Sequence, residues 1–225
     1  MRLMMFMKLR ILLLAILVVV FAAPSRANQV DYFTGSGVIN LATGSVPVPV
    51  GNTVWMGYFP TTAGFFTPGQ DFATLMANFT LLSTIQFGQD ASGVAGGGSI
   101  VPSPAGTFYG SVFGTVPTAP ASNPSSQLFI WMFNANAPAS ATQWAILTNS
   151  AWTLPSGSGQ ILIDPTVNGT VPPGALGVLT PNGGGGFDIN LQVAPIPEPS
   201  TYFLGLAGAG VMIGAVRLRR PRHVN

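Results

Sequence analysis

The positive charges of this chain lie near its two ends, and this segregation limits what the middle can form. Four basic residues stand within the first 26 positions, and four arginines and the single histidine follow position 216. Between Asn28 and Pro199 the formal charge is −6, contributed by Asp31, Asp71, Asp90, Asp164, Asp188 and Glu198. A segment without cations cannot neutralise phosphates, which argues against nucleic acid as a partner. The chain has no cysteine, so a domain in this segment must be held together by its core.

The N-terminal end has the three parts of a secretory signal peptide. Three basic residues stand within the first ten positions, an apolar run covers 11–23, and residues 25–27 form a small-x-small cleavage pattern. We therefore expect a signal-peptide helix in 1–27, which signal peptidase removes by cutting between Ala27 and Asn28. The alternative is an uncleaved membrane anchor, which the short apolar run and the adjacent cleavage pattern disfavour.

The C-terminal end combines a proline-rich stretch, an apolar run and a basic cluster. Prolines at 195, 197 and 199 remove backbone donors and favour an extended conformation, so Glu198 should be accessible to an enzyme. The apolar run 202–216 would span roughly 22 Å as a helix, less than the ~30 Å of a hydrocarbon core, and predicts a marginal transmembrane helix. Arginines after this run should keep that end in the cytoplasm. By these arguments alone, the tail could also be an ordinary C-terminal anchor with a proline linker.

The combined tail, residues 195–225, resembles the PEP-CTERM sorting signal of proteins exported by Gram-negative bacteria. The matching residues are the motif Pro197, Glu198 and Pro199, the span 202–216, and the basic end 217–222 with Arg217, Arg219, Arg220 and Arg222 as the cytoplasmic stop. Ile196 stands where the family often has valine, which is a conservative departure. The resemblance implies that an exosortase, a membrane protease-transpeptidase, recognises the Pro-Glu-Pro motif and releases or transfers the protein. It also implies export through the inner membrane, a transient membrane anchor, a final place at the cell surface or outside the cell, and association with exopolysaccharide in a biofilm.

Residues 28–194 predict one mainly β domain, in which short apolar runs alternate with glycine, proline and asparagine. One helix is expected after Asp71 as its cap, because apolar residues follow at helical spacing: Phe72, Leu75, Met76, Phe79 and Leu82. Strands are expected at 30–40, 53–59, 107–116, 127–133, 143–148, 160–163 and 187–193. The pattern favours an antiparallel, β-sandwich-like domain, with 127–133 and 143–148 as adjacent strands at its core.

Missing residue types exclude most catalytic machinery in this domain. It has no histidine, so it cannot build a Ser-His-Asp triad or a histidine zinc site. It has no lysine, so it lacks a P-loop and a Schiff-base nucleophile. We therefore expect no cofactor and no metal.

A pair of carboxylates for glycoside hydrolysis is the remaining enzymatic option. The candidates are Asp31, Asp71, Asp90, Asp164 and Asp188. Their sequence neighbours favour caps and turns instead, as for Asp164 before Pro165. Asp188 and Asn190 offer oxygen ligands of the type that calcium prefers, but no calcium-binding motif surrounds them.

Aromatic residues carry the main alternative function. Sugar rings could stack on a flat surface drawn from Trp55, Tyr58, Tyr109, Trp131, Trp144 and Trp152. Trp131 and Trp144 lie in the most apolar strands and should be buried, so we expect Trp152 and Tyr58 to be the exposed members. The sequence thus favours a non-enzymatic, exported cell-surface or extracellular-matrix protein. A carbohydrate-binding module is the alternative, and a glycosidase with paired carboxylates is the second alternative.

Overall fold

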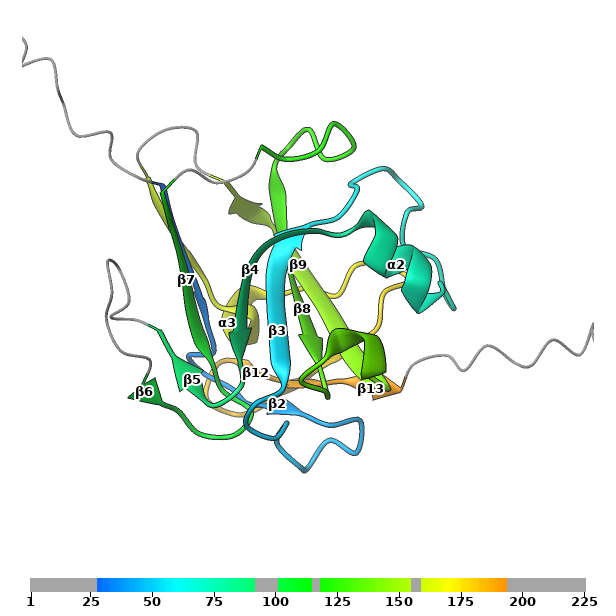
Figure 1. Ribbon diagram of the computed structural model, residues 1–225. Helices are drawn as coiled ribbons and strands as arrows, with labels where there is room; N and C mark the ends of the chain where they lie inside the picture. Colours follow the sequence, from blue (N-terminus) through cyan, green and yellow to red (C-terminus); the bar gives the residue numbers. More distant parts are fainter. Residues whose placement is uncertain (1–27, 92–100, 115–117, 155–158, 194–225) are drawn as a thin grey trace, which may run out of the picture.

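The computed structural model describes residues 28–91, 101–114, 118–154 and 159–193 (Figure 1). The strands in these ranges are β1 (Asn28–Phe33), β2 (Ile39–Asn40), β3 (Thr53–Tyr58), β4 (Thr80–Gln86), β5 (Gln89–Asp90), β6 (Val101–Pro102), β7 (Tyr109–Gly114), β8 (Gln127–Phe133), β9 (Gln143–Thr153), β10 (Gln160–Ile163), β11 (Val178–Pro181), β12 (Phe187–Asn190) and β13 (Gln192–Val193). The helices are α2 (Phe72–Asn78), α3 (Pro165–Asn168) and a 3-10 turn at Pro138–Ser140. The prediction of a mainly β domain with one short helix is confirmed.

The expected signal peptide and the sorting tail lie outside the described residues. This holds for Ala27, for the motif Pro197–Glu198–Pro199, for the span 202–216 and for the arginines of 217–222. Within the described ranges, no helix combines the length and apolar character needed to cross a membrane. The cleavage site and the transmembrane helix stay predictions.

The strands form three sheets, and these are mixed rather than wholly antiparallel. The strand orders are β10-β1-β7-β5-β6, β11-β12-β2 and β13-β9-β8-β3-β4. β1 pairs with β10 in parallel, with Tyr32 opposite Ile163, and the pairs β2–β12 and β5–β7 are also parallel. The antiparallel prediction is therefore wrong for these three pairs. Turn-forming residues in the sequence predict the pairing of strands that are consecutive along the chain. Parallel pairing joins segments that are far apart in sequence, so these residues do not indicate it.

The sheet β13-β9-β8-β3-β4, called the central sheet below, is buried on both faces along its middle strand β8. β8 is a continuous apolar run, confirmed at the predicted bounds 127–133, and it pairs with β9 in the predicted antiparallel sense. Its side chains alternate: Leu128 and its successors at even positions enter one core, and Phe129 and its successors at odd positions enter another. A strand buried on both faces reads as an uninterrupted apolar run, which explains why this strand was predictable.

One side of the central sheet, called the inner face, packs against the other two sheets. It is formed by Val54, Met56, Tyr58, Leu128, Ile130, Met132, Ala145 and Leu147. Opposite these residues lie Val30 and Tyr32 from β1, Ile163 from β10 and Ile189 from β12, all fully buried. This is the main core of the domain.

The other side, called the aromatic face, is formed by Trp55, Phe59, Phe129, Trp131, Phe133, Trp144 and Ile146. It is covered by α2 and by the chain that leads into it, which contributes Phe65 and Phe66. Figure 1 shows α2 on the side of the central sheet away from β7. Trp131 alone contacts five other rings, at centroid separations of 4.9 to 5.9 Å.

The helix α2 begins where predicted and ends earlier than predicted. The Asp71 side chain caps it by accepting from Ala73 N at 2.8 Å and from Thr74 N at 3.1 Å. The Thr74 hydroxyl and these amides hold the pKa of Asp71 below its usual value. The chain leaves the helix after Asn78, so Leu82, expected on the helical stripe, lies in β4 instead. The run Phe79 to Leu82 suits either structure, and the pairing of β4 with β3 decides it.

Candidate functional site

The aromatic face becomes polar at one end, and a cleft lies there. Along β8 the side chains on this face run from Phe133 through Trp131 and Phe129 to Gln127. On the neighbouring strand β9, Thr148 stands opposite Phe129. The strand alternation therefore places an amide and a hydroxyl next to the last ring of the aromatic layer.

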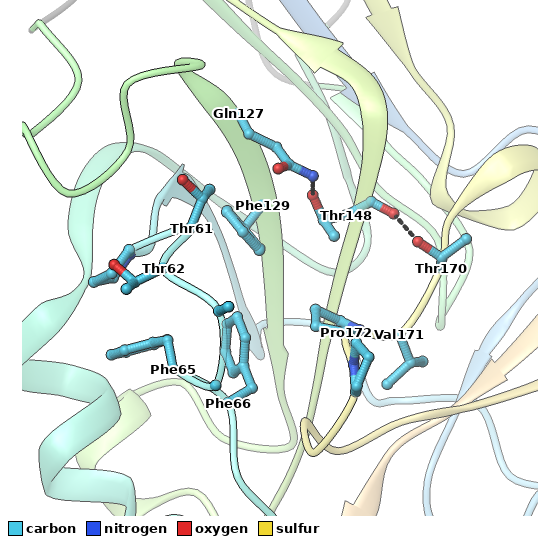
Figure 2. A pocket seen from close by; sticks show the side chains of 14 residues that line it. Thr61, Thr62, Phe65, Phe66, Gln127, Phe129, Thr148, Thr170, Val171 and Pro172 are labelled. Carbon is cyan, nitrogen blue, oxygen red and sulfur yellow. Dashed lines mark hydrogen bonds between the residues drawn. The ribbon is translucent and has the colours of Figure 1, made fainter.

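The cleft has a volume of about 570 Å³, within the range of ligand sites. Its fourteen lining residues come from four segments of the chain (Figure 2): 60–66, Gln127 and Phe129 of β8, Thr148 of β9, and 170–173. Phe129 is 3 % exposed and Thr148 is 8 % exposed, so these two residues form the floor. The residues between Thr62 and Gly64 are exposed and form the rim.

Hydrogen bonds fix the polar part of the cleft. Gln127 Nε2 donates to Thr148 Oγ1 at 2.9 Å, and that hydroxyl donates to Leu128 O at 2.8 Å. Thr170 Oγ1 donates to Thr148 O at 2.7 Å, as Figure 2 shows. The bond from Nε2 sets the orientation of the Gln127 amide and leaves its Oε1 as an acceptor.

None of the fourteen lining residues is ionisable. The cleft therefore has no group for general acid-base or nucleophilic catalysis of the kinds weighed from the sequence, and no carboxylate for a metal. It offers hydroxyls, an amide and ring surfaces, which suit binding of an uncharged ligand. None of the residues lining this cleft was predicted as a site residue from the sequence. Two polar residues at the ends of predicted strands could have indicated the cleft. Gln127 begins the apolar run 127–133, and Thr148 ends the apolar run 143–148.

Three of the five candidate aspartates serve local structure. Asp71 caps α2, and Asp164 caps α3 by accepting from Thr166 N at 2.9 Å. Asp188 Oδ1 accepts from Val38 N at 3.0 Å, which ties β12 to the segment before β2. The described residues contain no cluster of three His, Cys, Asp or Glu side chains that could hold a metal ion.

Asp31 and Asp90 are brought to the same face of the sheet β10-β1-β7-β5-β6, on either side of Tyr109. Register places Asp31 opposite Ser111 and Asp90 opposite Tyr109 in the same strand β7. Burial, followed by the charges of Asp31 and Asp90, raises the pKa of the Tyr109 hydroxyl.

Asp31 is 1 % exposed and its carboxylate is saturated with donors. Gln29 Nε2 and Gln160 Nε2 each donate to Oδ2 at 2.8 Å, and the Ser111 hydroxyl donates to Oδ1. These donors come from β1, β10 and β7, so Asp31 links three strands of the sheet. A carboxylate enclosed in this way is not placed to attack a substrate.

The expectation that Trp152 and Tyr58 are exposed is wrong. Trp152 is 1 % exposed and its Nε1 donates to Asn168 Oδ1 at 3.1 Å. β9 continues past the predicted end at 148 to Thr153, and an irregularity in its pairing with β8 returns Trp152 to the core. Tyr58 is fully buried because it shares the inner face of β3 with Val54 and Met56. Neither side chain offers a stacking surface, whereas the predicted burial of Trp131 and Trp144 is confirmed.

The similarity of this chain to known proteins lies in its C-terminal tail. A sequence model of the PEP-CTERM protein-sorting motif matches residues 195–220. This motif defines a class of exported proteins with a C-terminal membrane-anchor sorting signal, which exosortase-like machinery processes. The chain is a PEP-CTERM domain-containing protein. No curated protein and no solved structure matches it.

Proposed function

We propose that this chain is a non-enzymatic protein of the cell surface or extracellular matrix. Its β domain is the cargo, the signal peptide 1–27 directs it through the inner membrane, and residues 195–225 sort it after export. The match of the sorting motif to residues 195–220 carries the export and sorting part of this proposal. The charge distribution supports it, because the cations lie in the two terminal segments, where they favour a cytoplasmic location for flanking residues.

In this proposal, two enzymes remove the ends. Signal peptidase cuts between Ala27 and Asn28, and an exosortase-like enzyme acts at Pro197–Glu198–Pro199 after the span 202–216 has held the chain in the membrane. The arginines of 217–222 stop transfer at the cytoplasmic side. Exopolysaccharide is the partner that this destination suggests.

The roles of the aspartates support a non-enzymatic domain. Asp71 and Asp164 cap helices, and Asp31 is enclosed by donors from three strands. A glycosidase needs two carboxylates with access to one glycosidic bond, and the enclosure of Asp31 argues against that use of the Asp31–Asp90 pair.

The test of sorting is the change Glu198→Ala. We expect it to leave a membrane-retained species of full tail mass, because the anchor stays while the recognised carboxylate is gone. The measurement is the intact mass of the protein in the membrane and released fractions. Pro197→Ala, inside the motif, should behave like Glu198→Ala, and the matched change Pro195→Ala, outside it, should be processed as in the wild type. Normal release of Glu198→Ala would contradict the proposal.

A second readout follows from the charge distribution. The processed chain, from Asn28 to the motif, contains no lysine or arginine. Trypsin should therefore leave it at its original mass even in urea, and it should focus at acidic pH. Internal tryptic fragments of the released protein would show that a terminal segment persists.

A further inference from the structure

We propose that the cleft between Pro60–Phe66 and Thr170–Pro173 binds a neutral polysaccharide, with a sugar ring seated over the floor formed by Phe129 and Thr148. This inference assigns a ligand site to the β domain. It goes beyond the proposed sorting and does not depend on how the tail is processed.

The charge of the ligand follows from the lining and its surroundings. None of the fourteen lining residues is ionisable, so the cleft has no partner for a charged group. Residues 28–193 carry five aspartates and no lysine, arginine or histidine. Their field disfavours an anionic ligand such as a phosphate or an acidic polysaccharide. The cleft therefore suits an uncharged ligand.

The apolar wall suits the C–H face of a sugar. Phe65 and Phe66 are half-buried on the loop that edges the cleft. Phe66 is held edge-on against Phe59 at 5.2 Å and tilted against Phe129 at 5.8 Å, so its ring orientation is set by neighbours. Rings fixed in this way offer surface for stacking without losing rotamer freedom on binding.

The polar wall suits the hydroxyls of a sugar. The Gln127 amide is oriented by its bond to Thr148 Oγ1, which leaves Oε1 to accept from a ligand hydroxyl. Thr61, Thr62 and Thr170 line the same cleft. Thr61 Oγ1 already donates to Ser122 O and Thr170 Oγ1 to Thr148 O, so these two hydroxyls are left to accept from a ligand, whereas the exposed Thr62 hydroxyl can donate or accept. Figure 2 shows the threonines and Gln127 around the rings of Phe66 and Phe129.

The backbone of the site is already held in place. Thr61 N donates to Ser122 O at 2.9 Å, and Phe65 N donates to Thr62 O at 3.0 Å, which fixes the loop. Pro60, Pro172 and Pro173 restrict the chain on both sides. A preformed site avoids the ordering cost that weakens binding to flexible loops.

A polymeric sugar fits better than a peptide. A peptide that adds a strand needs an open sheet edge, but the edge of β9 beside the cleft is occupied. Thr148 N donates to Thr170 O at 2.9 Å, and Ile146 N donates to Leu176 O at 2.9 Å. The exposed residues at both walls, such as Thr62 and Pro173, leave room for a chain to enter and leave.

The test is affinity gel electrophoresis of the exported protein, taken from the released fraction or, where the tail keeps it in the membrane, from the detergent-solubilised membrane fraction. Native gels contain hydroxyethylcellulose, dextran or galactomannan as neutral probes, or alginate as an anionic probe. We expect at least one neutral polysaccharide to retard the wild type. Thr62→Trp, which fills the cleft from its exposed rim, and Phe66→Ala, which removes a stacking ring, should each weaken binding about tenfold or more.

The matched control is Thr84→Trp, which places the same ring on an exposed threonine of the smaller hollow beside Trp55. It should bind like the wild type. If Phe66→Ala does not fold, Thr62→Trp decides, because its side chain is at the surface. The inference is overturned if no neutral probe retards the wild type, if alginate alone does, or if the cleft variants and Thr84→Trp bind equally.

Discussion

Both faces of the central sheet are covered by other parts of the chain, but they pack against these parts with different side chains. The inner face carries mostly aliphatic side chains such as Val54, Ile130 and Leu147, with Tyr58 as its one aromatic ring among the residues named above, and it is covered by two further sheets. The aromatic face is covered by a helix of seven residues and by loops. Large rings fill the space above a sheet with few backbone segments, because each ring buries far more area than an aliphatic side chain. The aromatic face therefore depends on its rings for order, whereas the inner face also has paired strands above it.

The largest expected effect separates two neighbours on β8. Trp131→Leu should lower the free energy of unfolding by about 3 kcal/mol, because it leaves a cavity among five contacting rings. Ile130→Leu, the adjacent change on the inner face, should cost less than about 1.5 kcal/mol because the volume is conserved. Urea unfolding of the two variants measures the difference. Equal losses of unfolding free energy in the two variants would contradict the proposed difference between the faces.

Two glycines test how rigidly each side is packed. A Cβ on Gly57, on the aromatic side of β3, would meet the carbonyl oxygen of Thr80 and lie 2.7 Å from Phe79 Cζ. A Cβ on Gly110 of β7 would meet the ring of Tyr32, a side chain of the main core. Gly57→Ala should therefore cost about 2 to 3 kcal/mol and Gly110→Ala about 1 to 2 kcal/mol, because a side chain can shift where a paired backbone cannot. The reverse order in chemical unfolding would contradict this argument.

Alkaline pH should act on the main core and leave the aromatic face unaffected. Burial raises the pKa of Tyr32 well above its usual range despite its hydrogen bond to Ser83, and burial also raises the pKa of Tyr58. Above about pH 10 the unfolded tyrosines ionise while the folded ones stay neutral, so stability should fall by up to about 1.4 kcal/mol per pH unit for each tyrosine.

The unfolding midpoint in urea between pH 8 and 11 measures this slope. Tyr32→Phe should make the slope shallower by about one tyrosine, whereas Tyr109→Phe, at a partly exposed position, should change it less. Identical slopes for wild type and Tyr32→Phe would show that the main core does not carry the dependence.

The smallest expected effect concerns the indole N–H groups. On the aromatic face, Nε1 of Trp131 and of Trp144 is buried with no hydrogen-bond partner among the described residues. In the main core, Trp152 Nε1 donates to Asn168. Trp152→Phe should therefore cost about 1 kcal/mol more than Trp144→Phe, because it breaks a bond, whereas Trp144→Phe removes an unpaired donor. Thermal or urea unfolding of the two variants measures this difference. A larger loss of unfolding free energy for Trp144→Phe than for Trp152→Phe would contradict the prediction.

The elements that could be predicted from the sequence are those that form because of residues close to one another in the chain. β8 and β10 were predicted at their observed bounds, because apolar runs flanked by polar or turn-forming residues define a strand by themselves. β4 was missed because its first residues fit a helical spacing equally well, and its pairing with β3 is a long-range contact. β1 and β10 pair across about 130 positions of sequence, and no pattern within either strand indicates its partner.

The site was less predictable than the fold for the same reason. Trp152 and Tyr58 were expected at the surface because single residues give no measure of what covers them, and both lie in the core. The cleft joins four segments of the chain, and none of the four has a recognisable motif. Its polar floor exists because β8 and β9 align Phe129 with Thr148, which is a matter of register.

Residue types and their spacing along the chain were enough to identify the sorting motif, the charge segregation, the mainly β character and the central apolar strand. These features depend on residue type and short-range spacing, so they can be read without knowing the partners of any segment. The tertiary structure decided which strands run parallel, which aromatic rings are buried, that Asp31 is enclosed by three strands, and where the neutral cleft forms. Each of these depends on contacts between residues far apart in the chain, and such contacts arise only when the sheets pack together.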